Sequence, residues 1–275
     1  MGEEIILTSK RLENKVIVVS GGTKGVGRTV VEEFAKEGAA VVFGGRDKTA
    51  ANIILKNIKA EGGTAEFVYT ELKDVNSCKQ LFDKAKEKYG KITGFFNYAG
   101  VTPVSPLDTC DVDTFNNVMD INFRAAFFCC QQAVIHMREN GGGSIVLTGS
   151  PHAWGGEKDR AAYACSKGVL LTLMEHIAKN YGEDNIRCNY LTLGWTPTDG
   201  EVLLRKQQGQ TEMELRKEAS KVIPMGRMNE KSDYVGILVY LMSDESAMMS
   251  GSVLRATGGW YIGTSLQNNN NHTIQ

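Results

Sequence analysis

Short apolar runs alternate with longer amphipathic stretches along most of the chain. Residues 15–20 (KVIVVS) form a continuous β-branched run, which is typical of a strand buried on both faces of a parallel sheet. Comparable runs predict further strands at 40–44, 65–69, 92–96, 144–148, 186–193 and 252–256. Open α/β sheets bind their ligands at the carboxyl ends of the strands.

Helical periodicity fills the intervals between these strands. Helices are predicted at 28–37, 49–61, 75–89, 111–140, around Tyr163 as far as Tyr181, and at 232–242. Because strands and helices alternate, without an internal repeat or long linker, we expect one doubly wound α/β domain over residues 1–275. Looser, charged helical pieces at about 195–225 suggest a substrate lid, or else a plain surface helix pair. The polar tail at about 267–275 is expected to be frayed.

The composition argues against nucleic-acid and membrane partners. The 275 residues have a formal net charge of −1 and are 42% hydrophobic, with charges of both signs interspersed. No window reaches the length of a membrane span, and the start MGEEIILTSK lacks the basic end and long apolar centre of a secretory signal. We therefore expect a globular, cytoplasmic protein.

The cysteines give no sign of a metal site. They lie at positions 78, 110, 129, 130, 165 and 188, without CxxC spacing and without histidines at zinc spacing. We interpret them as reduced thiols, most of them in the core.

A glycine-rich segment directly follows the first predicted strand. Gly21, Gly25 and Gly27 fall at the turn, ahead of a helical pattern that ends at Gly38. Glycines let the backbone approach a ligand, and exposed N–H groups at a helix start attract phosphate. A second strand follows at the distance that a dinucleotide-binding unit requires. A tight structural turn is the simpler alternative for the glycines alone.

The end of the second strand bears on the choice of cofactor. A carboxylate there would bind the ribose of NAD, whereas this chain has Gly45 followed by Arg46. Lys24 lies in the glycine loop, so two cations would bracket a 2′-phosphate, with bonds of roughly 1.5–3 kcal/mol each. NADP is favoured over NAD. Alternatively, both cations are solvated, and Asp47 partly neutralises the arginine.

Three polar groups between residues 150 and 167 suit one proton transfer. Tyr163 and Lys167 stand four residues apart in an Ala-rich segment, so both project from one helix face. A phenol must lose roughly three pKa units, about 4 kcal/mol, to act as a base near neutral pH. An ammonium about 4 Å away supplies on the order of 4 kcal/mol in a partly screened site. Ser150 ends a predicted strand, where its hydroxyl would hold a substrate oxygen.

Two further features carry weaker signals. A Tyr–Lys pair at this spacing also arises by chance, so the rest of the chain must support it. Asn122 falls in the middle of the 111–140 helix, which is unfavourable unless its side chain has a role such as opening the helix to bind water. An ordinary polar position is the alternative.

Together these features resemble the short-chain dehydrogenases/reductases. The resemblance rests on the glycine pattern, the run Asn97-Tyr-Ala-Gly100, Asn122, Ser150, Tyr163 and Lys167, and it covers roughly residues 12–263. Ser150 lies thirteen positions before Tyr163, as in that family. The resemblance implies a Rossmann fold with a seven-stranded parallel sheet and a nicotinamide cofactor.

The resemblance also implies roles for individual residues. Tyr163 exchanges the proton with the alcohol or ketone, Ser150 binds the reacting oxygen, and Lys167 lowers the phenol pKa and binds the ribose. Asn122 anchors a water that connects Lys167 to solvent. The expected cofactor residues are Gly21, Thr23, Lys24, Gly25, Val26, Gly27, Arg46, Glu71, Leu72, Asn97, Ala99, Gly100, Tyr163, Lys167, Thr196 and Thr198. The expected substrate residues are Ser150, His152, Trp154, Tyr163 and Trp195, with no metal.

Several positions depart from the family pattern. Glu71 stands where an aspartate is usual, Tyr98 replaces an asparagine, Leu193 a proline and Thr257 an aspartate. These changes affect cofactor detail and substrate more than the reaction. A homotetramer built on the two long helices and the last strand is the family expectation.

The substrate is the least determined part of the prediction. Asn122, Ser150, Tyr163 and Lys167 form the expected catalytic tetrad. The aromatic residues beside this tetrad and the lid residues Leu203, Leu204 and Met213 suggest an apolar wall suited to a bulky ketone. Asp159-Arg160 and the segment from Gly258 look similar to bacterial bile-acid hydroxysteroid dehydrogenases, which favours a steroid or bile acid. Polyols, sugar acids and 3-oxoacyl thioesters are the alternatives. A non-catalytic dinucleotide sensor is a further alternative, although it would not need an intact tetrad.

Overall fold

One sheet of seven parallel strands organises the molecule. The computed structural model describes residues 10–207 and 209–260. The strand order is β3-β2-β1-β4-β5-β6-β7, and every neighbouring pair is parallel. The strands are β1 (Val16–Ser20), β2 (Ala40–Gly45), β3 (Thr64–Tyr69), β4 (Gly94–Asn97), β5 (Gly143–Gly149), β6 (Ile186–Leu193) and β7 (Val253–Ala256). The doubly wound α/β prediction is confirmed, with the largest shift at β4, which begins at Gly94 rather than at residue 92.

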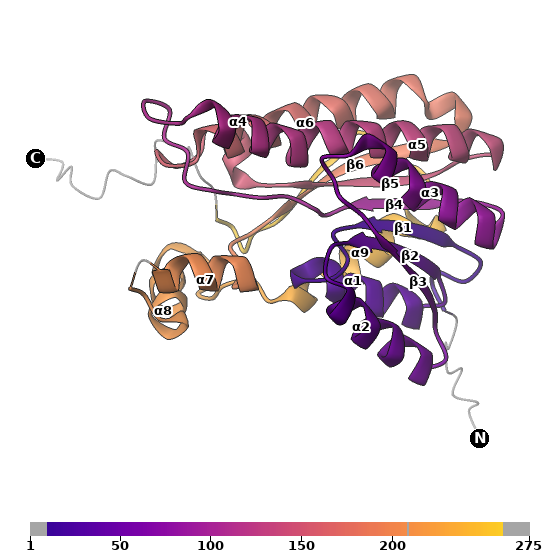
Figure 1. The fold of residues 1–275 in the computed structure, drawn as a ribbon, viewed down its shortest axis with the longest axis horizontal. Coiled ribbons are helices and arrows are strands. Elements are labelled where there is room, and N and C mark those ends of the chain that lie inside the picture. Colours follow the sequence, from indigo (N-terminus) through magenta and orange to yellow (C-terminus); the bar gives the residue numbers. More distant parts are fainter. Residues whose placement is uncertain (1–9, 208, 261–275) are drawn as a thin grey trace, which may run out of the picture.

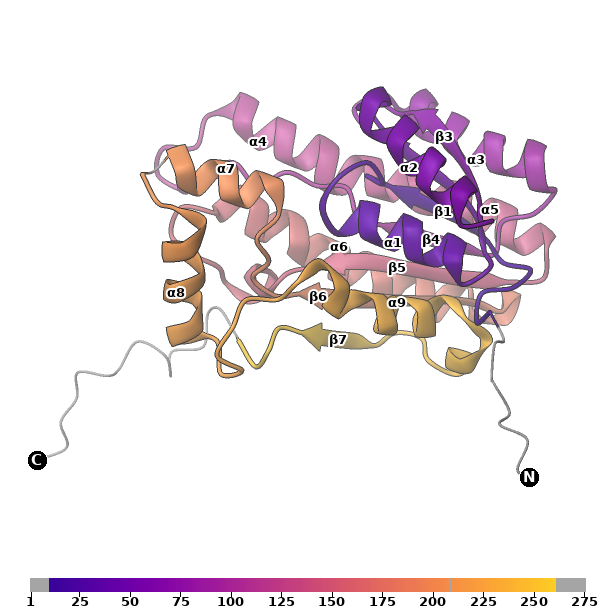
Figure 2. The ribbon, with the colours of Figure 1, turned by 90° about the horizontal axis from the view of Figure 1, so that it is seen from below.

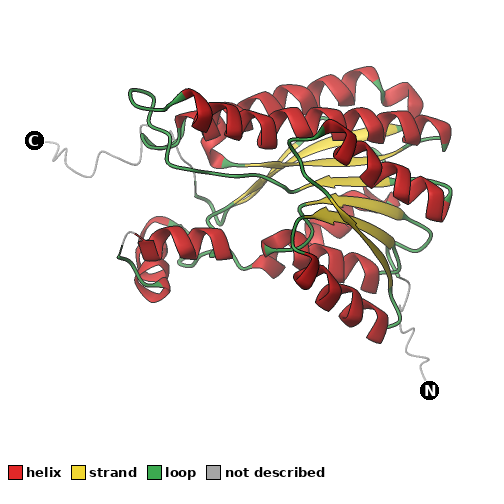
Figure 3. Ribbon diagram, viewed as in Figure 1, coloured by secondary structure: helices red, strands yellow, loops and turns green. Residues whose placement is uncertain are grey.

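Helices cover both faces of the sheet (Figures 1 and 3). One face carries α3 (Val75–Tyr89), α4 (Val112–Met119), α5 (Ala125–Glu139) and α6 (Ala161–Asn180), and the other carries α1 (Gly25–Lys36), α2 (Lys48–Ala60) and α9 (Val235–Met242). Helices α7 (Asp199–Gln207) and α8 (Glu212–Val222) stand beyond the ends of the strands (Figure 2). These two helices form the segment that the sequence suggested as a lid.

The strands are buried because their side chains alternate between two cores. Val16 and Val18 of β1 pack into the core beneath α3, α5 and α6, whereas Ile17 and Val19 pack into the core beneath α1, α2 and α9. A continuous apolar run is therefore what a central strand of this sheet requires.

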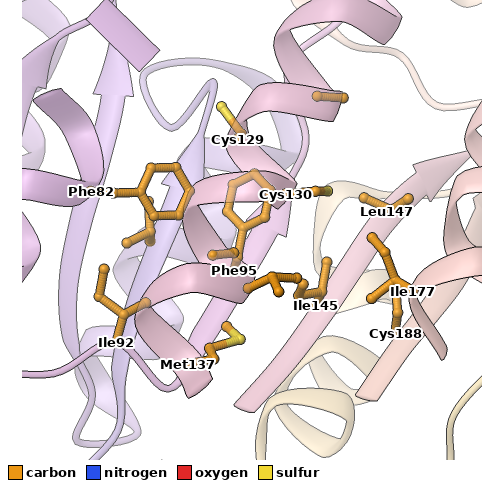
Figure 4. Close-up of a cluster of buried hydrophobic side chains, with 14 of the residues drawn as sticks. Phe82, Ile92, Phe95, Cys129, Cys130, Met137, Ile145, Leu147, Ile177 and Cys188 are labelled. Atoms are coloured by element: carbon orange, nitrogen blue, oxygen red, sulfur yellow. The ribbon is translucent and has the colours of Figure 1, made fainter. Parts of the chain in front are cut away.

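The first of these cores contains most of the cysteines (Figure 4). Cys78, Cys129, Cys130 and Cys188 are buried there, and all six cysteines of the chain are free. Burial raises the pKa of Cys130 and Cys188, which keeps both thiols protonated. Most cysteines thus behave as small apolar core residues.

The helical stretch predicted at 111–140 is confirmed, and it contains a π-helical turn in its middle. Helix α4 ends at Met119, a π-helical turn spans Asp120–Arg124, and α5 begins at Ala125. The turn carries Asn122, whose carboxamide bonds to the main chain of Val101 on both sides, accepting from its N–H at 2.7 Å and donating to its carbonyl at 2.9 Å. The widened turn brings this side chain to the segment that follows β4, in keeping with the use of π-turns at functional sites.

The strand order reverses direction next to β1, and this point fixes the place of any ligand. From β1 the chain moves outward to β2 and β3, then returns to place β4 on the other side of β1. The loops after β1 and β4 therefore diverge and leave a crevice at the carboxyl edge, which is the usual ligand position in open α/β sheets.

A buried tyrosine on β6 ties this edge together. The Tyr190 hydroxyl accepts a hydrogen bond from the Ser150 N–H at 3.3 Å and donates one to the Lys167 carbonyl at 3.0 Å. Its ring fills the space beside Gly149, where a Cβ atom would lie 2.0 Å from the ring. Tyr190 thus joins β6, the end of β5 and α6.

We predict that Tyr190→Phe lowers the free energy of unfolding by about 1–3 kcal/mol, because it leaves a buried N–H and a buried carbonyl without their partner. Urea denaturation at fixed pH measures the change. Tyr69→Phe, at the exposed end of β3, serves as the matched control and should change stability by less than about 0.5 kcal/mol. Equal effects of the two substitutions would contradict the bridging role.

Candidate active site

Two adjoining hollows lie along the carboxyl edge of the sheet. The first contains Ser150, Tyr163 and Lys167 in its lining. The second runs from the glycine loop to Arg46 and Glu71. Both are lined by Tyr98, Gly100, Val101 and Thr198, so they form one continuous cleft.

Helix α6 presents Tyr163 and Lys167 on one face, as their spacing predicts. The Lys167 side chain is buried, and its Nζ donates to the Thr148 carbonyl at 2.9 Å. Nζ lies 5.6 Å from the centroid of the Tyr163 ring. Burial lowers the pKa of Lys167 to about 8, because an ammonium loses hydration there.

The electrostatics of Tyr163 differ from the expectation that Lys167 dominates. Burial raises the pKa of Tyr163, opposed by a hydrogen bond with the Ser150 side chain and by the charge of Arg160. The expected net lowering is therefore absent from this structure, because desolvation of the phenolate outweighs the neighbouring groups. Tyr163 is protonated at neutral pH, so it is prepared to donate a proton.

Ser150 and His152 frame the tyrosine hydroxyl from the end of β5. Ser150 caps the short helix Pro151–Trp154, and its Oγ accepts from the His152 N–H at 3.3 Å. The His152 ring meets the Tyr163 ring edge-on, with centroids 5.4 Å apart. Burial lowers the pKa of His152 to about 4, and its Nδ1 accepts from the Glu157 N–H at 3.4 Å. The imidazole is therefore neutral near pH 7.

Asn122 supports the site from outside the cleft. It is fully buried, and its Nδ2 donates to Ser166 Oγ at 3.0 Å in addition to its two bonds with Val101. Ser166 Oγ in turn donates to the Tyr163 carbonyl at 2.7 Å. Asn122 thus connects the segment after β4 to the turn of α6 that carries the tyrosine.

The glycine loop is packed closely enough to demand glycine. A Cβ atom on Gly27 would lie 2.3 Å from the Gly21 carbonyl oxygen and 2.5 Å from the Tyr98 ring. The Tyr98 hydroxyl accepts from the Val26 N–H at 3.2 Å at the start of α1. This narrow loop and the helix start beside it suit the phosphates of a dinucleotide.

Most of the expected cofactor residues line the cleft. Those in the lining are Gly21, Thr23, Lys24, Gly25, Val26, Arg46, Glu71, Leu72, Ala99, Gly100, Tyr163, Lys167, Thr196 and Thr198. Gly27 and Asn97 lie beneath it, with the Asn97 Oδ1 accepting from Ser20 Oγ at 3.0 Å. Thr196 Oγ1 lies 2.5 Å from the Tyr234 hydroxyl.

The two cations expected at the 2′-position are each paired with a carboxylate. Arg46 Nη1 lies 3.7 Å from Glu71 Oε2, and Lys24 Nζ lies 3.2 Å from Asp47 Oδ2. All four side chains are at least partly exposed, so solvent weakens both pairs. A phosphate would compete with these carboxylates for the cations.

Among the expected substrate residues, Ser150, His152, Tyr163 and Trp195 line the first hollow. Trp154 does not line it, because its ring packs edge-on against Tyr190, with the Arg255 guanidinium 4.8 Å from its centroid.

The lid side of the cleft is more polar than predicted. Of the three residues expected to form an apolar wall, Leu203 and Met213 are 57% and 77% exposed and Leu204 is half-buried, and none of them lines either hollow. The lining instead contains Glu157, Arg160, Glu201 and Arg205. Trp195 and Trp260 supply the apolar part, stacked with ring centroids 5.5 Å apart.

Sequence reasoning missed Glu157, Glu201, Arg205 and Tyr190. Glu201 and Arg205 are four residues apart, a spacing that normally indicates a solvated ion pair on a helix surface. Only the position of α7 over the cleft turns this pair inward.

The described ranges, 10–207 and 209–260, contain neither a metal cluster nor a membrane helix. No group of three or more His, Cys, Asp or Glu residues there is arranged to hold a metal ion. No helix in these ranges is long and apolar enough to span a membrane.

Comparison with known proteins places this geometry in a family. A family model described as enoyl-(acyl carrier protein) reductase matches residues 21–261. The chain is 32% identical to a 7α-hydroxysteroid dehydrogenase of Clostridium sardiniense over 93% of this chain and 96% of that protein. It is 31% identical to an L-rhamnose 1-dehydrogenase (NAD(P)⁺) of Azotobacter vinelandii, over 91% and 98% of the two chains.

A solved structure agrees with these relatives. A 7α-hydroxysteroid dehydrogenase complexed with NADH and 7-oxo glycochenodeoxycholic acid superposes with a TM-score of 0.85 and 27% identity, covering 92% of this chain and 96% of that one. With the family match, the relatives above 30% identity and the matching sheet order, the chain belongs to the short-chain dehydrogenase/reductase family, whose members are NAD(P)-dependent oxidoreductases acting on alcohols and ketones.

Proposed function

We propose that this protein interconverts a secondary alcohol and a ketone with NADP(H), using Tyr163 as general acid and base, and that its substrate is a steroid or bile acid. The observation that carries the proposal is the shared lining of one hollow by Ser150, Tyr163 and Lys167, which adjoins the hollow at the glycine loop. The bound nicotinamide supplies or accepts the hydride.

Residues of the protein donate and accept the proton and orient the reacting oxygen. Tyr163 keeps its proton at neutral pH because burial raises its pKa, so it donates to a ketone oxygen during reduction and takes the proton back during oxidation. Ser150 bonds the same oxygen and orients it. Lys167 supplies positive charge that stabilises the phenolate and binds the ribose. Asn122 holds the main chain around this group and anchors a water that leads to Lys167.

The preference for NADP rests on Lys24 and Arg46 in the lining of the second hollow. A 2′-phosphate carries more negative charge than either competing carboxylate, and Arg46 offers it a guanidinium fork. Glu71 and Asp47 reduce the preference without reversing it.

The substrate proposal combines two supports. The hydroxysteroid dehydrogenases at 32% and 27% identity favour a steroid, and the Trp195–Trp260 stack offers it an apolar surface. The polar lid side favours a steroid that carries an acid, or alternatively a sugar, as in the L-rhamnose relative. A 3-oxoacyl substrate and a non-catalytic dinucleotide sensor are also compatible with the fold, and the turnover experiments below distinguish them.

The proposal also includes the oligomeric state of the protein, the role of residues 195–225 and the cellular location. We propose a homotetramer, since Phe127 and Ile135 are exposed on α5 and line an apolar groove with Leu173 and Ile177 of α6. We propose that residues 195–225 act as a movable lid, because α7 contributes Glu201 and Arg205 to the lining of the cleft. We also propose that the protein is cytoplasmic, in keeping with its free thiols. The tail at 267–275 lies outside the described residues.

The first prediction concerns the acid and base. Tyr163→Phe should lower kcat by about 10²–10⁴-fold, because it removes the exchangeable proton. NADPH binding, followed by cofactor fluorescence, should stay within about twofold. Tyr181→Phe, at the C-terminal end of the same helix, is the control. Undiminished turnover in the Tyr163 variant would refute the mechanism, and tight NADPH binding without turnover of any ketone in the wild type would favour the sensor.

The second prediction concerns the cofactor. Arg46→Ala should raise the KM for NADPH by about tenfold and leave that for NADH nearly unchanged, because only NADPH carries the 2′-phosphate. Lys36→Ala, an equally exposed cation in the last turn of α1, is the control. Two results would contradict this proposal: equal use of NADH and NADPH by the wild type, or an unchanged ratio of the two KM values in Arg46→Ala. Either would mean that Lys24 and Arg46 do not select the 2′-phosphate.

The third prediction concerns the buried charge of Lys167. Its folded-state pKa of about 8 lies below the ordinary 10.5, so its charge opposes folding below pH 8 and this cost disappears between about pH 8 and 10.5. Lys167→Met removes the cost. Its stability relative to the wild type should therefore fall by about 3 kcal/mol over that range.

Urea denaturation of both proteins at several pH values measures this difference. Lys179→Met, exposed in the last turn of α6, is the control and should show a flat difference. A flat difference for Lys167→Met as well would mean that the ammonium is not desolvated.

A further inference from the structure

Arg205 of α7 lies in the wall of the first hollow, where it contacts two neighbouring side chains. Its guanidinium lies 5.3 Å from the centroid of the Trp195 ring, and its Nε donates to Glu201 Oε1 at 2.9 Å. The same carboxylate oxygen accepts from Trp195 Nε1 at 3.0 Å. Trp195 is in turn stacked on Trp260, so the arginine is supported by a ring below it and a carboxylate beside it.

The Nη edge of this guanidinium faces away from Glu201 and has no hydrogen-bond partner within the described part of the chain. Among residues 10–207 and 209–260, no hydrogen bond joins Nη1 or Nη2 of Arg205 to another residue, although the side chain is only 22% exposed. Arg205 lines the hollow that contains Tyr163. Two parallel N–H groups on a fixed plane match the two oxygens of a carboxylate.

The charges around the hollow tolerate an anion. Arg160, Lys167 and Arg205 line it together with two carboxylates, Glu157 and Glu201, and Arg160 is paired with Asp159 at 2.7 Å. Glu201 is already bonded twice, to Arg205 and Trp195. Burial raises the pKa of Glu157. A substrate carboxylate at Arg205 would therefore meet a carboxylate, Glu201, whose hydrogen bonds are already made, and the Nη edge of the guanidinium.

An apolar substrate fits this wall less well. A neutral, apolar ketone lying against Arg205 would remove water from a charged edge without replacing its hydrogen bonds, which is unfavourable. The Trp195–Trp260 stack nonetheless offers a flat apolar surface next to the cation. The wall thus combines an apolar platform with one anion-binding end.

We propose that Arg205 binds a carboxylate of the substrate, so that the substrate is a ketone or alcohol that also carries a carboxylic acid. This inference rests on the proposed function. It narrows the substrate class, because a neutral sterol, a neutral sugar and a simple ketone lack the group that Arg205 recognises.

The test compares matched acids and neutral analogues with NADPH as cofactor. The probes are a keto-steroid carboxylic acid with its methyl ester, and a keto-sugar acid with the corresponding keto-sugar. The wild type should prefer one acid over its neutral analogue by about tenfold or more in kcat/KM, mainly through KM. Arg205→Met should lower kcat/KM for that acid by about 10–100-fold and leave the neutral analogue nearly unchanged, as expected for one charge-assisted pair.

Two further variants separate recognition from folding. Arg205→Lys keeps the charge and should restore part of the acid preference, whereas Lys206→Met, the next and exposed residue of α7, should behave like the wild type. Equal use of acid and neutral analogue by the wild type, or equal loss for both in Arg205→Met, would overturn the inference.

A binding measurement distinguishes this failure from failure of the proposed function. Trp195 lies beneath Arg205, so tryptophan fluorescence of the NADPH-bound protein reports on probes at this wall. Acid binding that Arg205→Met weakens, without turnover of any probe, supports the carboxylate site and counts against the proposed reaction. Acids that bind no better than their neutral analogues overturn the carboxylate site, whatever the turnover.

Discussion

The bond between the Lys167 ammonium and the Thr148 carbonyl is the constraint on which the site depends. It joins α6 to the end of β5 inside the protein, where a charge is costly and must be hydrogen-bonded. The bond places the ammonium 5.6 Å from the Tyr163 ring. The same burial that lowers the pKa of the lysine to about 8 raises the pKa of the tyrosine, so Tyr163 stays protonated at neutral pH.

Hydrogen bonds between uncharged groups hold Lys167 and Tyr163 in place. Tyr190 links the Ser150 N–H to the Lys167 carbonyl, and Asn122 with Ser166 links the segment after β4 to the Tyr163 carbonyl. These contacts fix main-chain atoms rather than reacting groups. They explain how loops from separate strands keep one geometry at the carboxyl edge, since the ends of β5 and β6 and the segment after β4 are each tied to α6.

The opposite wall of the cleft follows a different principle. Glu201 and Arg205 lie in a charged helix whose apolar residue Leu203 faces solvent, and their paired charges turn inward beside Trp195. The side of the cleft that contains Tyr163 and Lys167 is thus built on the sheet and α6, whereas the opposite wall comes from a segment that stands apart from both cores.

The alternation of strands and helices, the glycine loop and the spacing of Tyr163 and Lys167 follow from the sequence, because they depend on local periodicity and on neighbours one helical turn apart. The spatial order of the strands, the π-turn at Asn122 and the Tyr190 bridge required the tertiary structure, since each joins residues far apart in the chain. The electrostatics of the site required the tertiary structure more than any other feature. Nothing local shows that burial outweighs Lys167 at the tyrosine, that Glu71 pairs with Arg46, or that Arg205 faces the cleft, because desolvation and pairing depend on what the folded chain brings together.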